Sequence, residues 1–131
     1  MKTLLAVVVT FLLFQTVSAQ ITSESPTPLG CDGMLGYFDS VLSRALSEEN
    51  KDSILIVIAR SGNGEKLSVN QQRLKSFEKY FTGFRPFPKE RLVLAKGEKR
   101  NGLGKLEFYI NGKLADELFL NKKQRVCSGC C

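Results

Sequence analysis

The sequence contains no histidine. This absence excludes every serine or cysteine nucleophile that depends on an imidazole base. Paired carboxylates could in principle act as a general acid and base. However, Glu48-Glu49 fall at an expected helix end and Asp116-Glu117 in an expected strand, and we interpret both pairs as solvated surface side chains. The glycine-rich stretch at 62–66 lacks the spacing of a phosphate-binding loop. We therefore expect no enzymatic activity and no cofactor.

The chain also lacks an internal repeat and an Asn-x-Ser/Thr glycosylation site. Its first 19 residues have the pattern of a targeting segment. A positive start at Met1-Lys2, an apolar run from Leu4 to Phe14 and small residues before Gln20 predict a secretory signal peptide. A retained membrane anchor is the less favoured alternative, because the run is short for a bilayer. Residues 20–30 predict an extended lead-in and residues 31–131 a single domain. We expect a periplasmic or extracellular protein without a transmembrane span after signal removal.

Four cysteines, Cys31, Cys127, Cys130 and Cys131, predict a domain stapled by disulfides in an oxidising compartment. Three pairings are possible, and we expect at least one bond from Cys31 to the C-terminal cluster. A thiol–disulfide function for Cys127 and Cys130 is an alternative, although nothing places this motif at a helix start that would activate a thiolate. Metal binding is not expected, because adjacent cysteines give poor tetrahedral geometry and no histidine can complete a mixed site.

Hydrophobic patterning predicts two helices and four strands. The apolar run Ile54 to Ala59 predicts a central strand that is covered on both faces. One amphipathic helix is expected from Asp32, and a second is expected to begin near Leu67 or Ser68 and to bury Leu67, Leu74, Phe77 and Phe81. After this helix, two aromatic residues, Phe84 and Phe87, lie in a proline-rich turn, and we expect them to pack on the core rather than to form a ligand platform.

The remaining strands are expected at 91–95, parallel to the central strand, at 106–110 and at 114–120. Asn111-Gly112 indicates a hairpin. A two-residue turn would place Leu106 opposite Glu117, so a three-residue turn is preferred. The predicted fold is a small α+β two-layer sandwich, with a mixed sheet and two helices on one face, in the order helix–strand–helix–strand–strand–strand.

Residues from about Leu35 to Ile110 resemble the outer-membrane protein A-like, peptidoglycan-associated domain. The resemblance rests on the central strand, its glycine-containing turn and the following helix positions, Asn70, Arg73, Leu74, Phe77, Tyr80 and Phe81. In that family an aspartate after the strand and an arginine on the helix grip the diaminopimelate of peptidoglycan. Arg73 matches the arginine, whereas Ser61 stands where the family has the aspartate.

The resemblance implies a ligand site formed by Arg73, Asn70, Ser61 and Asn63. We expect Arg73 to face an opening beside the turn, and its replacement by alanine to change stability by no more than roughly 0.5 kcal/mol. The predicted function is binding of peptidoglycan or another anionic envelope polymer by an exported domain. A structural or protein-binding domain without a small ligand is the alternative.

A nucleic-acid partner is the other interpretation of the basic composition, which gives a net charge of +6. Basic residues do gather around one expected loop, at Lys96, Lys99, Arg100 and Lys105. No base-stacking motif accompanies them, so contact with phosphates would be nonspecific and easily screened by salt. We expect no specific nucleic-acid binding.

Overall fold

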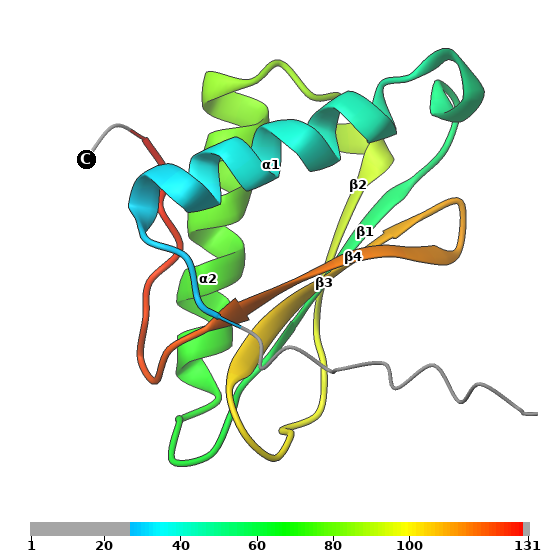
Figure 1. The fold of residues 1–131 in the computed structure, drawn as a ribbon. Coiled ribbons are helices and arrows are strands. Elements are labelled where there is room, and N and C mark those ends of the chain that lie inside the picture. Colours follow the sequence, from blue (N-terminus) through cyan, green and yellow to red (C-terminus); the bar gives the residue numbers. More distant parts are fainter. Residues whose placement is uncertain (1–26, 130–131) are drawn as a thin grey trace, which may run out of the picture.

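The structure is a computed structural model that describes residues 27–129 (Figure 1). The elements are, in chain order, α1 (Cys31–Ala45), β1 (Leu55–Arg60), α2 (Ser68–Glu78), β2 (Leu92–Lys96), β3 (Gly104–Ile110) and β4 (Lys113–Leu120). The strands form one sheet in the order β2-β1-β3-β4, in which only β1 and β2 are parallel. The predicted α+β fold, with its mixed sheet and element order, is confirmed. No helix in the described range is long and apolar enough to cross a bilayer.

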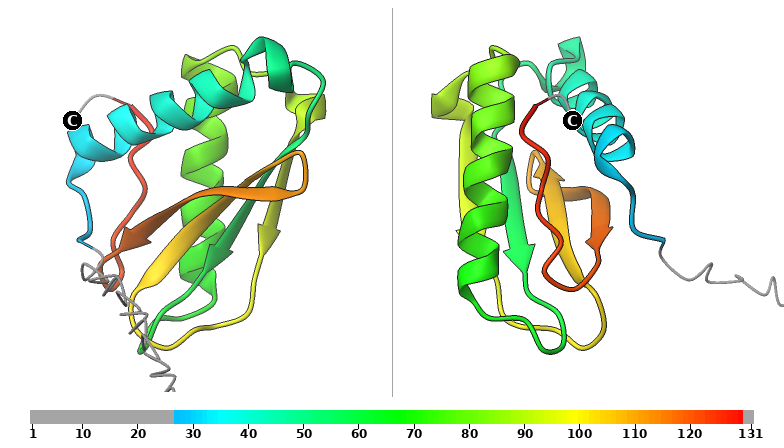
Figure 2. Two further views of the ribbon diagram at one scale, coloured as in Figure 1. Left: turned by 45° about the vertical axis from the view of Figure 1, so that its right-hand side comes forward. Right: turned by 90° about the vertical axis from the view of Figure 1, so that its left-hand side faces the viewer.

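Both helices pack on the same face of the sheet (Figure 2). Phe38 of α1 and Phe77 of α2 meet edge to face, with ring centroids 5.1 Å apart, and both contact Phe108 of β3. These rings are fully buried, as is Phe81 beside them. A continuous aromatic cluster therefore holds the helices to the sheet. Its burial stabilises this packing because it removes a large apolar area from water.

The central position of β1 is confirmed, but the expectation that both of its faces are covered is wrong. Leu55, Val57 and Ala59 are buried under the helices, whereas Ile56 and Ile58 on the other face are only half-buried. A continuous apolar run does not distinguish a strand between two helical layers from one whose second face is covered only by neighbouring side chains. Within residues 27–129, both helices lie on the other face, so no helix covers this second face (Figure 2).

The second helix begins where the sequence predicts, and Leu74, Phe77 and Phe81 of the predicted stripe are buried, but Leu67 is not. Leu67 is 63% exposed, whereas Asn70 and Arg73 are fully buried beside Leu74 and Phe77. A π-helical turn, Lys79–Phe84, continues the chain beyond α2. Two polar residues thus occupy part of the core-facing side of α2.

The β3–β4 hairpin has a two-residue turn, so the predicted three-residue turn is wrong. Asn111 and Gly112 both have positive φ, 52° and 74°, and Ile110 pairs with Lys113. These angles suit the twist of a tight hairpin. A β-bulge at Ala115 then shifts the register by one residue.

Because of this bulge, Leu106 pairs with Leu118 rather than with Glu117. Leu118 and Leu120 are consequently buried, at 2% and 0% exposure. The bulge brings the apolar residues of β4 to the helical face, which is the outcome that the three-residue turn was expected to achieve.

A disulfide joins Cys31 at the start of α1 to Cys127, with Cα atoms 5.6 Å apart. The predicted bond between Cys31 and the C-terminal cluster is therefore confirmed. Cys130 and Cys131 lie outside the described residues, as does the expected signal peptide. The segment that leads to Cys127 follows β4 and runs back beside α2 toward the start of α1 (Figures 1 and 2).

Candidate functional site

The turn after β1, residues 61–65, is packed tightly against the loop that precedes β3. The amide of Asn63 donates to the carbonyl of Gly102, and the amide of Arg100 donates to the carbonyl of Ser61. A Cβ on Gly62 would lie 2.4 Å from the Gly102 carbonyl oxygen, so only glycine fits at this contact. The two loops therefore cover the carboxyl end of β1, where an opening is expected from the sequence.

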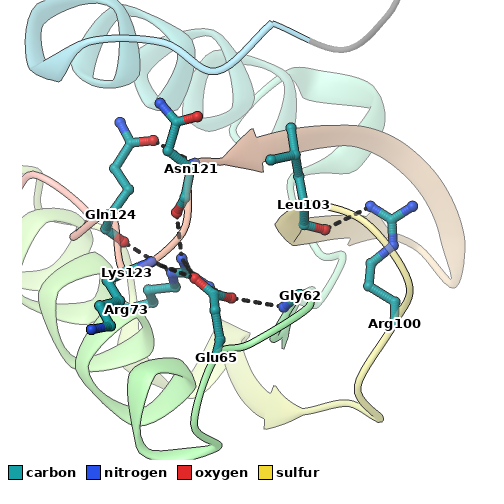
Figure 3. Close-up of polar contacts among 8 residues, drawn as sticks. All are labelled: Gly62, Glu65, Arg73, Arg100, Leu103, Asn121, Lys123 and Gln124. Carbon is teal, nitrogen blue, oxygen red and sulfur yellow. Dashed lines mark hydrogen bonds and ion pairs between the residues drawn. The ribbon is translucent and has the colours of Figure 1, made fainter.

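Arg73 lies beneath this turn and forms a buried ion pair with Glu65 (Figure 3). Its Nη1 and Nη2 donate to the two carboxylate oxygens at 2.9 and 2.7 Å, a bidentate arrangement. Its Nε donates to the carbonyl of Gln124 and its Nη2 also donates to that of Asn121. The side chains of Arg73 and Glu65 are 0% and 1% exposed.

The carboxylate of Glu65 receives two further hydrogen bonds, from the amides of Gly62 and Lys123, each at 2.7 Å. Burial raises the pKa of Glu65, but the hydrogen bonds from Arg73 and these two amides, together with the charge of the guanidinium, outweigh burial. The pKa of Glu65 therefore lies below its usual value. The pair holds the β1 turn, α2 and the C-terminal segment together.

The expectation that Arg73 faces an opening is wrong, because its guanidinium is enclosed by Glu65 and two carbonyls. Ser61 and Asn70 are also fully buried, and their side chains find no hydrogen-bond partner among the described residues. Of the four predicted ligand residues, only Asn63 is exposed, where it helps line a small hollow of about 270 Å³. The turn does bring these residues into one region, but mostly as part of the interior.

The basic residues that the sequence places around one loop are partly neutralised. Lys105 forms ion pairs with Glu107 and Glu117 on the open face of the sheet. Arg100 donates to the carbonyl of Leu103 and lies over the ring of Phe119. This loop therefore presents less free positive charge than its sequence indicates.

A different group of cations surrounds a cleft of about 390 Å³ between the start of α2 and the C-terminal segment. Its basic lining residues are Lys66, Lys122, Lys123 and Arg125, all exposed. No carboxylate is among the described residues that line it. We refer to this site as the basic cleft. Its walls are at least 50 residues apart in the sequence, so patterning along the chain did not reveal it.

The ion pair beneath the basic cleft explains how its two walls are positioned. Lys123 has a positive φ of 60° and directs its amide to Glu65. Gly64 lies so close to Lys122 that an added Cβ would meet the ammonium nitrogen at 2.8 Å. The one feature of the sequence that could have indicated the basic cleft is the basic run Lys122-Lys123-x-Arg125, which lies next to the expected disulfide.

Chemically, the basic cleft offers positive charge and hydrogen-bond donors, including Ser68 and Gln72. The described residues contain no group of three potential metal ligands. Cys127 pairs with Cys31 and not with Cys130, the partner that the thiol–disulfide hypothesis requires. The positive charge and the donors make the basic cleft suited to binding an anion.

Comparisons with protein-family models, with curated proteins and with solved structures find no match to this chain. The resemblance to the outer-membrane protein A-like domain therefore stays a prediction.

Proposed function

We propose that the protein is an exported, non-enzymatic domain that binds an anionic component of the cell envelope, peptidoglycan or another anionic polymer, through the basic cleft. The observation that carries the proposal is the meeting of four basic side chains from two distant segments, with no carboxylate among the described lining residues. Convergent cations concentrate a positive potential that attracts anionic groups. The disulfide between Cys31 and Cys127 is consistent with export.

This proposal moves the ligand contact away from Arg73. The guanidinium of Arg73 is buried and acts on the site indirectly, by fixing the segment that carries Lys122 and Lys123. An anion at the basic cleft would meet exposed ammonium groups, whose attraction is screened by salt. Binding should therefore weaken steadily as ionic strength rises.

The test is retention of the mature protein on purified sacculi, before and after removal of their covalently attached anionic polymers. The cleft variant is Lys66→Glu/Lys122→Glu. The matched control is Lys51→Glu/Lys113→Glu, which makes the same change in net charge at exposed positions near the other end of the sheet.

We expect the cleft variant to lose retention and the control to keep it. Equal losses in both variants would show attraction by net charge alone and would contradict a defined site. If the parent protein is not retained on either preparation, the proposed function is wrong, and the structural or protein-binding alternative takes its place.

A further inference from the structure

The basic cleft is one end of a longer groove beside α2. Arg125 lines both the basic cleft and an adjoining hollow of about 590 Å³. Ser76, Lys79 and Ser128 line this second hollow and also a third, of about 490 Å³. These shared lining residues place the three hollows next to one another along α2, and together we call them the α2 groove.

Positive charge continues along the α2 groove beyond the basic cleft. Lys75, Lys79 and Lys89 are exposed and line its third hollow, where Glu78 is the one carboxylate among the described lining residues. From Ser68 to Lys79 the helix rises about 1.5 Å per residue, which places the two ends of this stretch roughly 16 Å apart. A single phosphate or carboxylate could occupy one end only.

An exposed aromatic ring lines the second hollow of the α2 groove, at the end of the π-helical turn that follows α2. Phe87 packs on the core as expected, but the expectation is wrong for Phe84, which is 57% exposed and lines the second hollow. It stacks on Tyr80, with ring centroids 6.2 Å apart and planes 26° apart. The hydroxyl of Tyr80 donates to Asp39, which also accepts from Arg85. Phe84 is thus a supported ring that offers a flat apolar surface in a hollow that Lys79 and Arg125 also line.

We propose that the ligand is a linear anionic polysaccharide, carboxylated or sulfated, that extends from the basic cleft along the α2 groove and lays a sugar ring on Phe84. This inference rests on the proposed function and specifies its ligand class. The separated cations match charges repeated along a polymer, and the aromatic face matches the apolar face of a sugar ring. Sites for single-stranded nucleic acid stack successive bases on several aromatic residues, whereas Phe84 is the one exposed aromatic lining the described groove.

The test uses fluorescence anisotropy at low and moderate salt with oligogalacturonates and chondroitin sulfate oligosaccharides of increasing length. Inorganic phosphate and an oligothymidylate of matched charge serve as the comparison anions. The groove variant is Lys75→Glu/Lys79→Glu, at exposed positions outside the basic cleft. Phe84→Ala removes the ring, and Lys51→Glu/Lys113→Glu is again the control of equal charge.

We expect affinity for the saccharides to rise with length until the groove is filled. The groove variant should lose about tenfold or more for the long oligomers, with a salt slope smaller by roughly 2, while phosphate binding stays within about twofold. Phe84→Ala should weaken the long saccharides and leave phosphate unaffected.

Each other outcome identifies what is wrong. If affinity does not depend on length while the cleft variant still loses binding, the α2 groove is not used and the proposed function stands. If the thymidylate binds as tightly as the saccharides and also depends on Phe84, the ligand class is wrong. If no anion binds, both proposals fail together.

Discussion

Replacing Arg73 should destabilise the protein far more than a surface change. In Arg73→Met the apolar stem is retained and the guanidinium is lost. Glu65 is then left without its counter-ion in a site that is 1% exposed, with only the amides of Gly62 and Lys123 as partners. Removing one member of a buried ion pair typically costs about 3–5 kcal/mol. The stranded carbonyls of Asn121 and Gln124 add to this cost.

The assay is urea unfolding at pH 7, followed by circular dichroism, with the disulfide intact. A loss of about 3–5 kcal/mol is a large share of the stability of a small domain, which is typically about 5–15 kcal/mol. Arg125→Met is the matched control, because Arg125 is an exposed arginine on the same C-terminal segment, and its loss should stay within about 0.5 kcal/mol.

A double variant, Glu65→Leu/Arg73→Met, distinguishes the ion pair from packing. When both charges are removed no buried carboxylate is stranded, so the double variant should be more stable than Arg73→Met alone. If Arg73→Met unfolds within about 0.5 kcal/mol of the parent with an unchanged urea dependence, the buried pair does not have the role argued here.

Three further results are expected. The pKa of Glu65 is lowered in the folded state, so its contribution to the free energy of unfolding is complete above its unfolded pKa of about 4.3 and is lost as the pH falls through the folded pKa. In urea unfolding between pH 7 and pH 2, Glu65→Gln should therefore lose less stability with falling pH than the parent protein does. The pair Cys31→Ser/Cys127→Ser should lose about 2–5 kcal/mol in thermal or urea unfolding, because it opens a loop with a sequence separation of 96, and an unchanged stability would contradict this. Deleting Ala115 should abolish cooperative unfolding, because it would turn the apolar residues of β4 to the open face; a natively folded deletion variant would show that the bulge is dispensable.

Local patterning was enough to predict most elements of the fold. The short apolar run of β1 and the helical spacing of the apolar residues in α2 can be read directly from the sequence, and they predict a strand and a helix. The hairpin shows the limit of such reasoning. Asn111-Gly112 correctly signals a tight turn, but the compensating bulge at Ala115 depends on packing under the helices, which strand alternation alone does not reveal.

The site was harder to predict for a related reason. The resemblance drew attention to Arg73, and the structure does place it below the β1 turn. Whether an arginine there faces a ligand or a buried carboxylate depends on where Glu65 and the segment after β4 lie. Those contacts join residues 8 and about 50 positions apart, beyond the reach of helix or strand periodicity.

The C-terminal segment links stability to the proposed binding site. Its carbonyls accept hydrogen bonds from Arg73, the amide of Lys123 donates to Glu65, and Cys127 anchors its end to α1. The side chains of Lys122 and Lys123 extend from the same short stretch into the basic cleft. The buried pair and the disulfide therefore hold these mutually repelling cations close together. A polyanion then meets a preorganised charge distribution, and less binding free energy is lost to ordering the protein.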